Sequence, residues 1–217
     1  QLKLKYISGL EWLVNQAIPA LKTFTGETLE YNPKMSKSLA GSSRNPKANI
    51  YLIGFMGSGK TTIGQLLAEK MGKEFYDIDD LIIARQGKSI YDIFNEHGEA
   101  YFRAVETEIL REMSEKEGVI VSCGGGIILS DENRETIKNN SFVIWLYSEL
   151  STCINRMKLK TRPLLAVENP FQIAKLIMDQ RRKLYFKCSD LLVNSERPAA
   201  KVMERIYDEF KKSGYYD

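Results

Sequence analysis

The sequence predicts an α/β fold in which a five-stranded parallel sheet is covered by helices on both faces. From residue 49 onward, short apolar runs rich in β-branched and aromatic residues alternate with segments of helical periodicity, which is typical of parallel sheets. A glycine-rich turn joins the first run to the first helical segment. The 217 residues, 43% of them apolar and 27% charged, have an ordinary globular composition.

The strands are predicted from five apolar runs, at residues 50–53, 75–78, 119–122, 142–147 and 191–193. Helices are predicted from the periodic segments 60–71, 79–85, 90–97, 100–116, 131–138, 149–158, 170–185 and 198–212. Capping residues agree with these limits: Ser89 precedes Asp92 by three residues, Gly72 follows the first helix, and Pro170 and Pro198 occupy first-turn positions.

Residues 1–48 are predicted to stand apart from the domain at 49–217. In segment 1–30 apolar residues recur at three- and four-residue steps, which predicts a helix that ends an upstream domain. Segment 31–48 is polar and rich in turn-forming residues, as in a linker. The chain begins with Gln1, and we therefore expect it to be a piece of a longer protein.

The charge and the cysteine content exclude several classes of partner. The formal net charge is +3, the whole basic excess lies in residues 1–48, and no basic stripe predicts nucleic-acid binding. No run approaches the roughly 18 apolar residues of a membrane span. Cys123, Cys153 and Cys188 lie far apart without metal-ligand spacing, which predicts a reduced, cytoplasmic protein.

Residues 54–61 match the phosphate-binding pattern G-x-x-x-x-G-K-[ST] at every fixed position, after a strand and before a helix. Glycines let successive backbone N–H groups point at phosphate oxygens, and the helix N-terminus adds partial positive charge. Lys60 can bridge the β- and γ-phosphates of ATP, and the Thr61 hydroxyl can bind Mg²⁺. The alternative is a glycine-rich turn without a ligand, which the full match disfavours. The predicted nucleotide-binding residues of this loop are Gly57, Ser58, Gly59, Lys60, Thr61 and Thr62.

Three carboxylates follow the second predicted strand, where open α/β sheets bind ligands. Asp77 can organise Mg²⁺ through water, and Asp79 can accept a proton from an attacking hydroxyl. Alternatively, Asp79 or Asp80 caps the next helix. We favour that alternative for Asp80 and not for Asp79.

Five motifs that follow the phosphate loop resemble, in order, those of the shikimate kinase family, over residues 49 to about 212. They are Phe75-Tyr76-Asp77-Ile78-Asp79, Phe102-Arg103-Ala104-Val105-Glu106, Gly124-Gly125-Gly126, Arg162-Pro163-Leu164-Leu165 and Arg181-x-x-Leu184-Tyr185. The resemblance implies a P-loop kinase fold and transfer of the γ-phosphoryl group of ATP to the 3-hydroxyl of shikimate, with Mg²⁺.

The resemblance also implies roles for individual residues. Shikimate is expected to be held by Asp79, Arg103, Gly124, Gly125, Gly126 and Arg181. Two guanidinium groups can grip its carboxylate with a geometry that Lys cannot reproduce. Glu106, one turn after Arg103, can pair with it. Lys60, Asp79 and Arg162 are the expected catalytic residues, Arg162 lying in a segment that resembles the mobile lid of the family. Arg156 is expected to stack on adenine, with Arg197 in the same pocket.

Residues 9–26 resemble the C-terminal helix of shikimate dehydrogenase. This implies that the chain is the end of a fused dehydrogenase–kinase. An unrelated extension helix is the alternative. The dinucleotide-binding loop of a dehydrogenase is absent, so we expect no dehydrogenase activity.

Two other functions remain open. A different small-metabolite kinase could use the same loop, and a sensor domain could bind ATP and shikimate without catalysis. A sensor could dispense with Lys60 or Asp79, and the chain has both.

Overall fold

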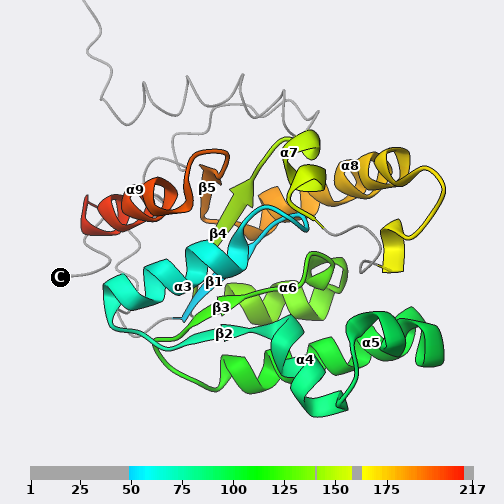
Figure 1. The fold of residues 1–217 in the computed structure, drawn as a ribbon. Coiled ribbons are helices and arrows are strands. Elements are labelled where there is room, and N and C mark those ends of the chain that lie inside the picture. Colours follow the sequence, from blue (N-terminus) through cyan, green and yellow to red (C-terminus); the bar gives the residue numbers. More distant parts are fainter. Residues whose placement is uncertain (1–48, 140, 158–162, 213–217) are drawn as a thin grey trace, which may run out of the picture. The chain divides into compact units, whose positions relative to one another are not determined.

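The fold is built on a five-stranded, fully parallel sheet with the strand order β2-β3-β1-β4-β5 (Figure 1). The strands are β1 (Asn49–Ile53), β2 (Phe75–Asp77), β3 (Ile120–Ser122), β4 (Ser141–Tyr147) and β5 (Leu191–Asn194). The predicted sheet is confirmed, and each strand overlaps the run that predicted it. All five residues of the central β1 are buried, as expected for a parallel strand covered on both faces.

Helices cover both faces of the sheet. They are α3 (Lys60–Met71), α4 (Ile78–Gln86), α5 (Ile90–Ser114), α6 (Asp131–Lys138), α7 (Leu150–Asn155), α8 (Pro170–Cys188) and α9 (Ala199–Lys212), with short 3₁₀ turns η1 (Ile127–Leu129) and η3 (Pro163–Leu165).

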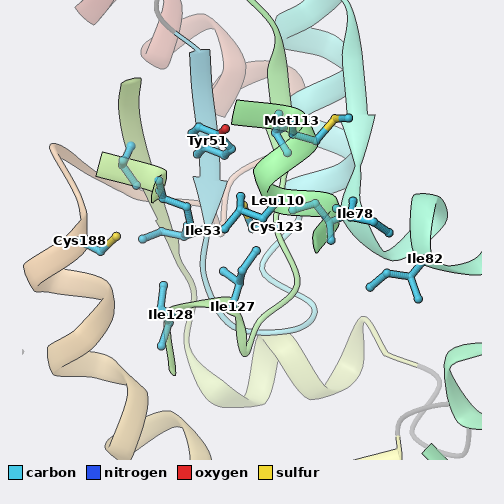
Figure 2. Close-up of a cluster of buried hydrophobic side chains, with 14 of the residues drawn as sticks. Tyr51, Ile53, Ile78, Ile82, Leu110, Met113, Cys123, Ile127, Ile128 and Cys188 are labelled. Carbon is cyan, nitrogen blue, oxygen red and sulfur yellow. The ribbon is translucent and has the colours of Figure 1, made fainter. Parts of the chain in front are cut away.

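Two hydrophobic cores follow from this arrangement. On one face, α3 and α9 contact each other and cover the sheet (Figure 1). On the other face, α5, η1 and α8 enclose the larger core, in which Leu110 and Ile127 lie beside Ile53 of β1 and Cys123, which directly follows β3 (Figure 2). The helices bury their apolar faces against the sheet. The strand ends, beyond these two cores, are therefore left for the polar side chains of the site.

Several local predictions are confirmed in detail. The bounds of α3 and α6 agree with the predicted ones, Gly72 ends α3 in the left-handed conformation, and the Ser89 side chain accepts a hydrogen bond from the Asp92 N–H. The helices predicted at 90–97 and 100–116 are the two parts of α5, which is interrupted at Gly98 with φ 79° and ψ 172°. A Cβ atom there would meet nothing within 4 Å, so the backbone conformation alone favours glycine.

The computed structural model describes residues 49–139, 141–157 and 163–212. The predictions for segments 1–30 and 31–48 and for Arg162 lie outside these residues. Within the described ranges, no helix has the length and apolarity to cross a bilayer.

Candidate active site

The phosphate loop connects β1 to α3, and two of its backbone carbonyl groups hold the side chain of Lys60. Lys60 is 9% exposed, and its Nζ donates to the carbonyl oxygens of Gly54 and Phe55, both at 3.0 Å. The ammonium group is therefore held by the loop, and the phosphate oxygens of a bound nucleotide would compete with these two carbonyl oxygens for it. Gly57 has φ 78°, and a Cβ there would lie 2.4 Å from the Cys153 carbonyl oxygen of α7. Both the conformation and the space exclude a side chain at this position.

Thr61 and Asp77 are brought together at the start of α3 and the end of β2. The Thr61 Oγ1 donates to Asp77 Oδ2 at 2.7 Å, while Asp77 Oδ1 accepts from the Asp79 N–H at 3.0 Å. Asp77 is thus the N-cap of α4. The expectation that Asp80 caps this helix was wrong, because Asp80 lies inside its first turn. Asp79, for which a capping role was not favoured, lies in the same turn and is not the cap either.

A hydroxyl and one carboxylate fit Mg²⁺, which keeps several waters and takes its other ligands from substrate phosphates. In the described ranges, no group of three or more His, Cys, Asp or Glu residues could hold a metal ion by itself. A metal here would therefore depend on bound phosphates.

Arg103 and Glu106 form an ion pair on α5, in which Glu106 is buried and Arg103 is half-buried. Arg103 Nη1 lies 2.6 Å from Glu106 Oε2, and Arg103 also donates to the exposed Glu99 at 3.0 Å. Glu106 is fully buried, so this is not the surface pair that i,i+3 spacing usually indicates.

Burial raises the pKa of Glu106 to about 6, although Arg103 acts to lower it. Burial also acts to lower the pKa of Arg103, but Glu106 and Glu99 raise it on balance. The pKa of Arg103 is raised despite its burial because it has two carboxylate partners, Glu106 and Glu99.

The glycine triplet after β3 makes room for these charged groups. A Cβ at Gly124 would lie 2.4 Å from Glu106 Oε1 and 3.1 Å from Asp79 Oδ1. A Cβ at Gly126 would lie 2.3 Å from Arg103 Nη2. The carboxylates of Glu106 and Asp79 and the guanidinium of Arg103 therefore approach glycine backbone where no side chain would fit.

Arg181, on α8, also reaches the glycine triplet. It is 4% exposed, and its Nη1 donates to the Gly125 carbonyl oxygen at 3.0 Å. Arg103 and Arg181 thus both approach the triplet and line the same cavity.

One cavity of about 380 Å³ joins the phosphate loop to this charged cluster. Most predicted site residues line it, namely Gly57, Gly59, Lys60, Thr61, Thr62, Asp77, Asp79, Arg103, Gly124, Gly125, Gly126, Arg156 and Arg181. An apolar wall of Ile90, Phe94 and Phe102 was not predicted as part of the site. Ile90 and Phe94 lay in a segment predicted only as a helix, and Phe102 was part of a motif but was given no role of its own.

The side of the site beyond β4 and β5 contains Arg156, whose Nη1 donates to the Ser195 carbonyl oxygen at 3.1 Å. The buried Ser148 and Ser195 hydroxyls lie 2.8 Å apart, and Ser195 Oγ donates to the Ser58 carbonyl oxygen at 2.8 Å. Ser148 and Ser195 therefore connect the phosphate loop to the backbone carbonyl that holds the Arg156 guanidinium.

Two predicted residues do not line the cavity. Ser58 is a buried residue of the loop itself, and Arg197 is exposed after β5. The neighbouring residues Ser195 and Glu196, rather than Arg197, supply the carbonyl oxygens that hold Arg156. Sequence spacing placed Arg197 near the pocket but could not give its direction.

A phosphoryl group can pass between two substrates only if a phosphate-binding loop and an acceptor pocket open on one space, and here they share a cavity. Fold and site together define a P-loop phosphotransferase. More particularly, the chain belongs to the shikimate kinase family, whose family model matches residues 56–211.

Individual relatives agree with this assignment. The chain is 38% identical over 166 residues to "Shikimate kinase" of Sulfurihydrogenibium sp. (strain YO3AOP1), covering 76% of this chain and 98% of the relative. Among solved structures, shikimate kinase from Acinetobacter baumannii in complex with shikimate is 34% identical, with a TM-score of 0.74, and the match covers 81% of this chain and 97% of that one. Shikimate kinase from Aquifex aeolicus is 37% identical, with a TM-score of 0.68 and coverage of 76% and 98%.

Proposed function

We propose that this chain transfers the γ-phosphoryl group of ATP to the 3-hydroxyl of shikimate, giving shikimate 3-phosphate and ADP. The observation that carries the proposal is the single cavity in which the phosphate loop faces Asp79, Arg103 and Arg181. The similar Acinetobacter baumannii enzyme is described in complex with shikimate, a small carboxylate that bears three hydroxyl groups.

The acceptor is proposed to bind through its carboxylate to Arg103 and Arg181. Their planar guanidinium groups suit bidentate recognition, and Glu106 fixes the rotamer of Arg103 from below. Gly124, Gly125 and Gly126 allow the ring to approach the backbone closely. Asp79 orients the reacting hydroxyl and takes its proton.

The nucleotide is proposed to bind along the phosphate loop, with N–H groups of Gly57 to Thr62 around the phosphates. Lys60 would exchange its two carbonyl partners for β- and γ-phosphate oxygens. Thr61 and Asp77 would hold Mg²⁺, which when bound neutralises charge on the transferred group. Arg156 is assigned to adenine and Arg162 to the phosphates. Arg197 is exposed and does not line the cavity, so its position does not support an assignment to the adenine pocket.

A coupled assay of ADP release tests the activity. We expect turnover that depends on shikimate and is absent with gluconate. The Asp79→Asn variant should lose on the order of 100-fold or more in kcat, the usual scale for loss of a general base. The matched control is Asp80→Asn, one residue further in the same helical turn but exposed and outside the cavity lining, and it should keep kcat within about twofold.

Folded wild-type protein without shikimate-dependent turnover would overturn the proposed function. Equal kcat values for the two variants would overturn the role of Asp79 alone. Thermal shifts with ATP and shikimate but without turnover would instead favour the sensor alternative.

We also infer that residues 9–26 derive from the C-terminal helix of an upstream dehydrogenase-like domain. Their sequence resemblance is the support for this inference. Sequencing the coding region before Gln1 tests it. An in-frame dinucleotide-binding domain is expected, and a stop codon in its place would refute the inference.

A further inference from the structure

Tyr185 is buried on α8 and reaches the glycine triplet. It is 1% exposed, its hydroxyl donates to the Gly125 carbonyl oxygen at 2.5 Å, and it does not line the cavity. Its ring stacks on Trp145 of β4, with the centroids 5.7 Å apart and an interplanar angle of 25°. Burial raises the pKa of Tyr185 to about 12, so the hydroxyl stays a donor across the neutral range.

The Gly125 carbonyl oxygen accepts from two donors on successive turns of α8. One is Arg181 Nη1 at 3.0 Å and the other is the Tyr185 hydroxyl. The guanidinium proposed to bind the acceptor is therefore anchored on a carbonyl whose own direction is fixed by a second residue. If that carbonyl turned, Arg181 would lose its anchor.

The same peptide unit includes the N–H of Gly126. Because a trans peptide is planar, its C=O and N–H groups point in opposite directions, and fixing one fixes the other. The space around this peptide is tight, since a Cβ at Gly125 would lie 3.3 Å from the Met56 N and 3.4 Å from the Gly54 O of the phosphate loop. A rotation of the peptide would thus disturb both the phosphate loop and the contact with Arg181.

We propose that Tyr185 is a positioning residue of the acceptor site: its hydroxyl fixes the Gly125–Gly126 peptide and, through the shared carbonyl, the guanidinium of Arg181. This inference rests on the proposed function, because it concerns binding of the carboxylate acceptor. A purely packing role, in which only the aromatic ring matters, makes a different prediction for the loss of the hydroxyl.

The Tyr185→Phe variant separates the two roles. It keeps the ring and its stacking on Trp145, and Gly125 keeps Arg181 as a donor, so we expect it to fold. Loss of one hydrogen bond of ordinary strength should raise KM for shikimate about fivefold, with kcat within about twofold and KM for ATP unchanged. The dissociation constant for shikimate, measured by calorimetry, should rise by the same factor.

The matched control is Tyr147→Phe. Tyr147 also packs on Trp145, edge-on at 5.9 Å, but its hydroxyl donates to Glu149 at 2.9 Å, away from the glycine triplet. We expect its KM for shikimate to equal that of the wild type. Both variants should be compared with the wild type by thermal unfolding, so that a difference in KM is not confused with a difference in stability.

A double-mutant cycle with Arg181→Lys tests the shared carbonyl. Because both residues act on the same peptide, the fold-change caused by Tyr185→Phe should be smaller in the Arg181→Lys background than in the wild type. Independent, multiplying effects would overturn the coupling.

The outcomes are distinguishable from failure of the proposed function. If the wild type shows no shikimate-dependent turnover, the proposed function fails first. If the wild type turns over shikimate and Tyr185→Phe has the same KM for it, the positioning role is refuted. Equal increases in the KM values for shikimate and ATP would also refute it, since that result indicates a general loss of structure.

Discussion

Replacing Glu106 with Gln should change how the stability of this protein depends on pH. Glu106 is fully buried, its Oε2 pairs with Arg103, and its Oε1 has no hydrogen-bond partner in the described part of the chain. Glutamine keeps the shape and the size of the side chain but cannot ionise. The substitution therefore isolates the cost of keeping this carboxylate charged inside the protein.

The magnitude follows from the pKa of Glu106, which burial raises from 4.5 to about 6. One unit corresponds to about 1.4 kcal/mol, so the folded state binds this proton more tightly by about 2 kcal/mol. Since the folded pKa lies above the unfolded one, this stabilisation is complete below pH 4.5 and is lost as the pH rises through about 6. In Glu106→Gln it is absent at every pH.

Urea unfolding at several pH values between 4 and 7.5 measures the effect. The free energy of unfolding of the wild type minus that of Glu106→Gln should fall by about 2 kcal/mol across this range. The control is Glu99→Gln, which removes the exposed partner of the same guanidinium. Its difference from the wild type should stay within about 1 kcal/mol. A constant difference for Glu106→Gln would refute the argument from desolvation.

Three further substitutions probe separate parts of the structure. Gly126→Ala should displace the Arg103 guanidinium, 2.3 Å from the new Cβ, and raise KM for shikimate about tenfold in steady-state kinetics; an unchanged KM would contradict the close approach. Gly64→Ala, whose Cβ would lie 2.5 Å from the Phe75 ring, should cost about 1–3 kcal/mol in thermal unfolding, and a gain in stability would contradict this. Ser195→Ala removes the hydroxyl that donates to the Ser58 carbonyl oxygen of the phosphate loop. KM for ATP should rise about fivefold while KM for shikimate stays constant, and the reverse pattern would contradict a role of Ser195 in holding the loop.

Local signals predicted the elements of the fold well. The glycine at position 72, the serine at 89 and the proline at 170 each mark a helix end through backbone or capping chemistry that depends on neighbours within a few residues. The break at Gly98 was likewise visible as a boundary between two periodic segments. The 3₁₀ turn η1 was not predicted, because three residues give too short a pattern.

The site was predictable where a motif joins adjacent residues, and less so where distant residues meet. Asp77, Asp79 and Asp80 lie close together in the sequence, and Asp80 was favoured as the cap of α4, whereas Asp77 occupies that position in the structure. The bonds from Tyr185 to Gly125 and from Ser195 to the loop join residues 60 and 137 positions apart. Such contacts depend on the packing of whole helices against the sheet.

The strand order has a consequence for how sites of this kind can diverge. The phosphate loop follows the central β1, with β2 and β3 on one flank and β4 and β5 on the other. Asp79, Arg103 and the glycine triplet come from the first flank, whereas Arg156 and Ser195 come from the second. Among the described site residues, Arg181 alone crosses over, from the helix between β4 and β5. If the proposed roles hold, a change of acceptor requires substitutions on the first flank and at Arg181, while the second flank and the phosphate loop can stay unchanged as the nucleotide-binding part.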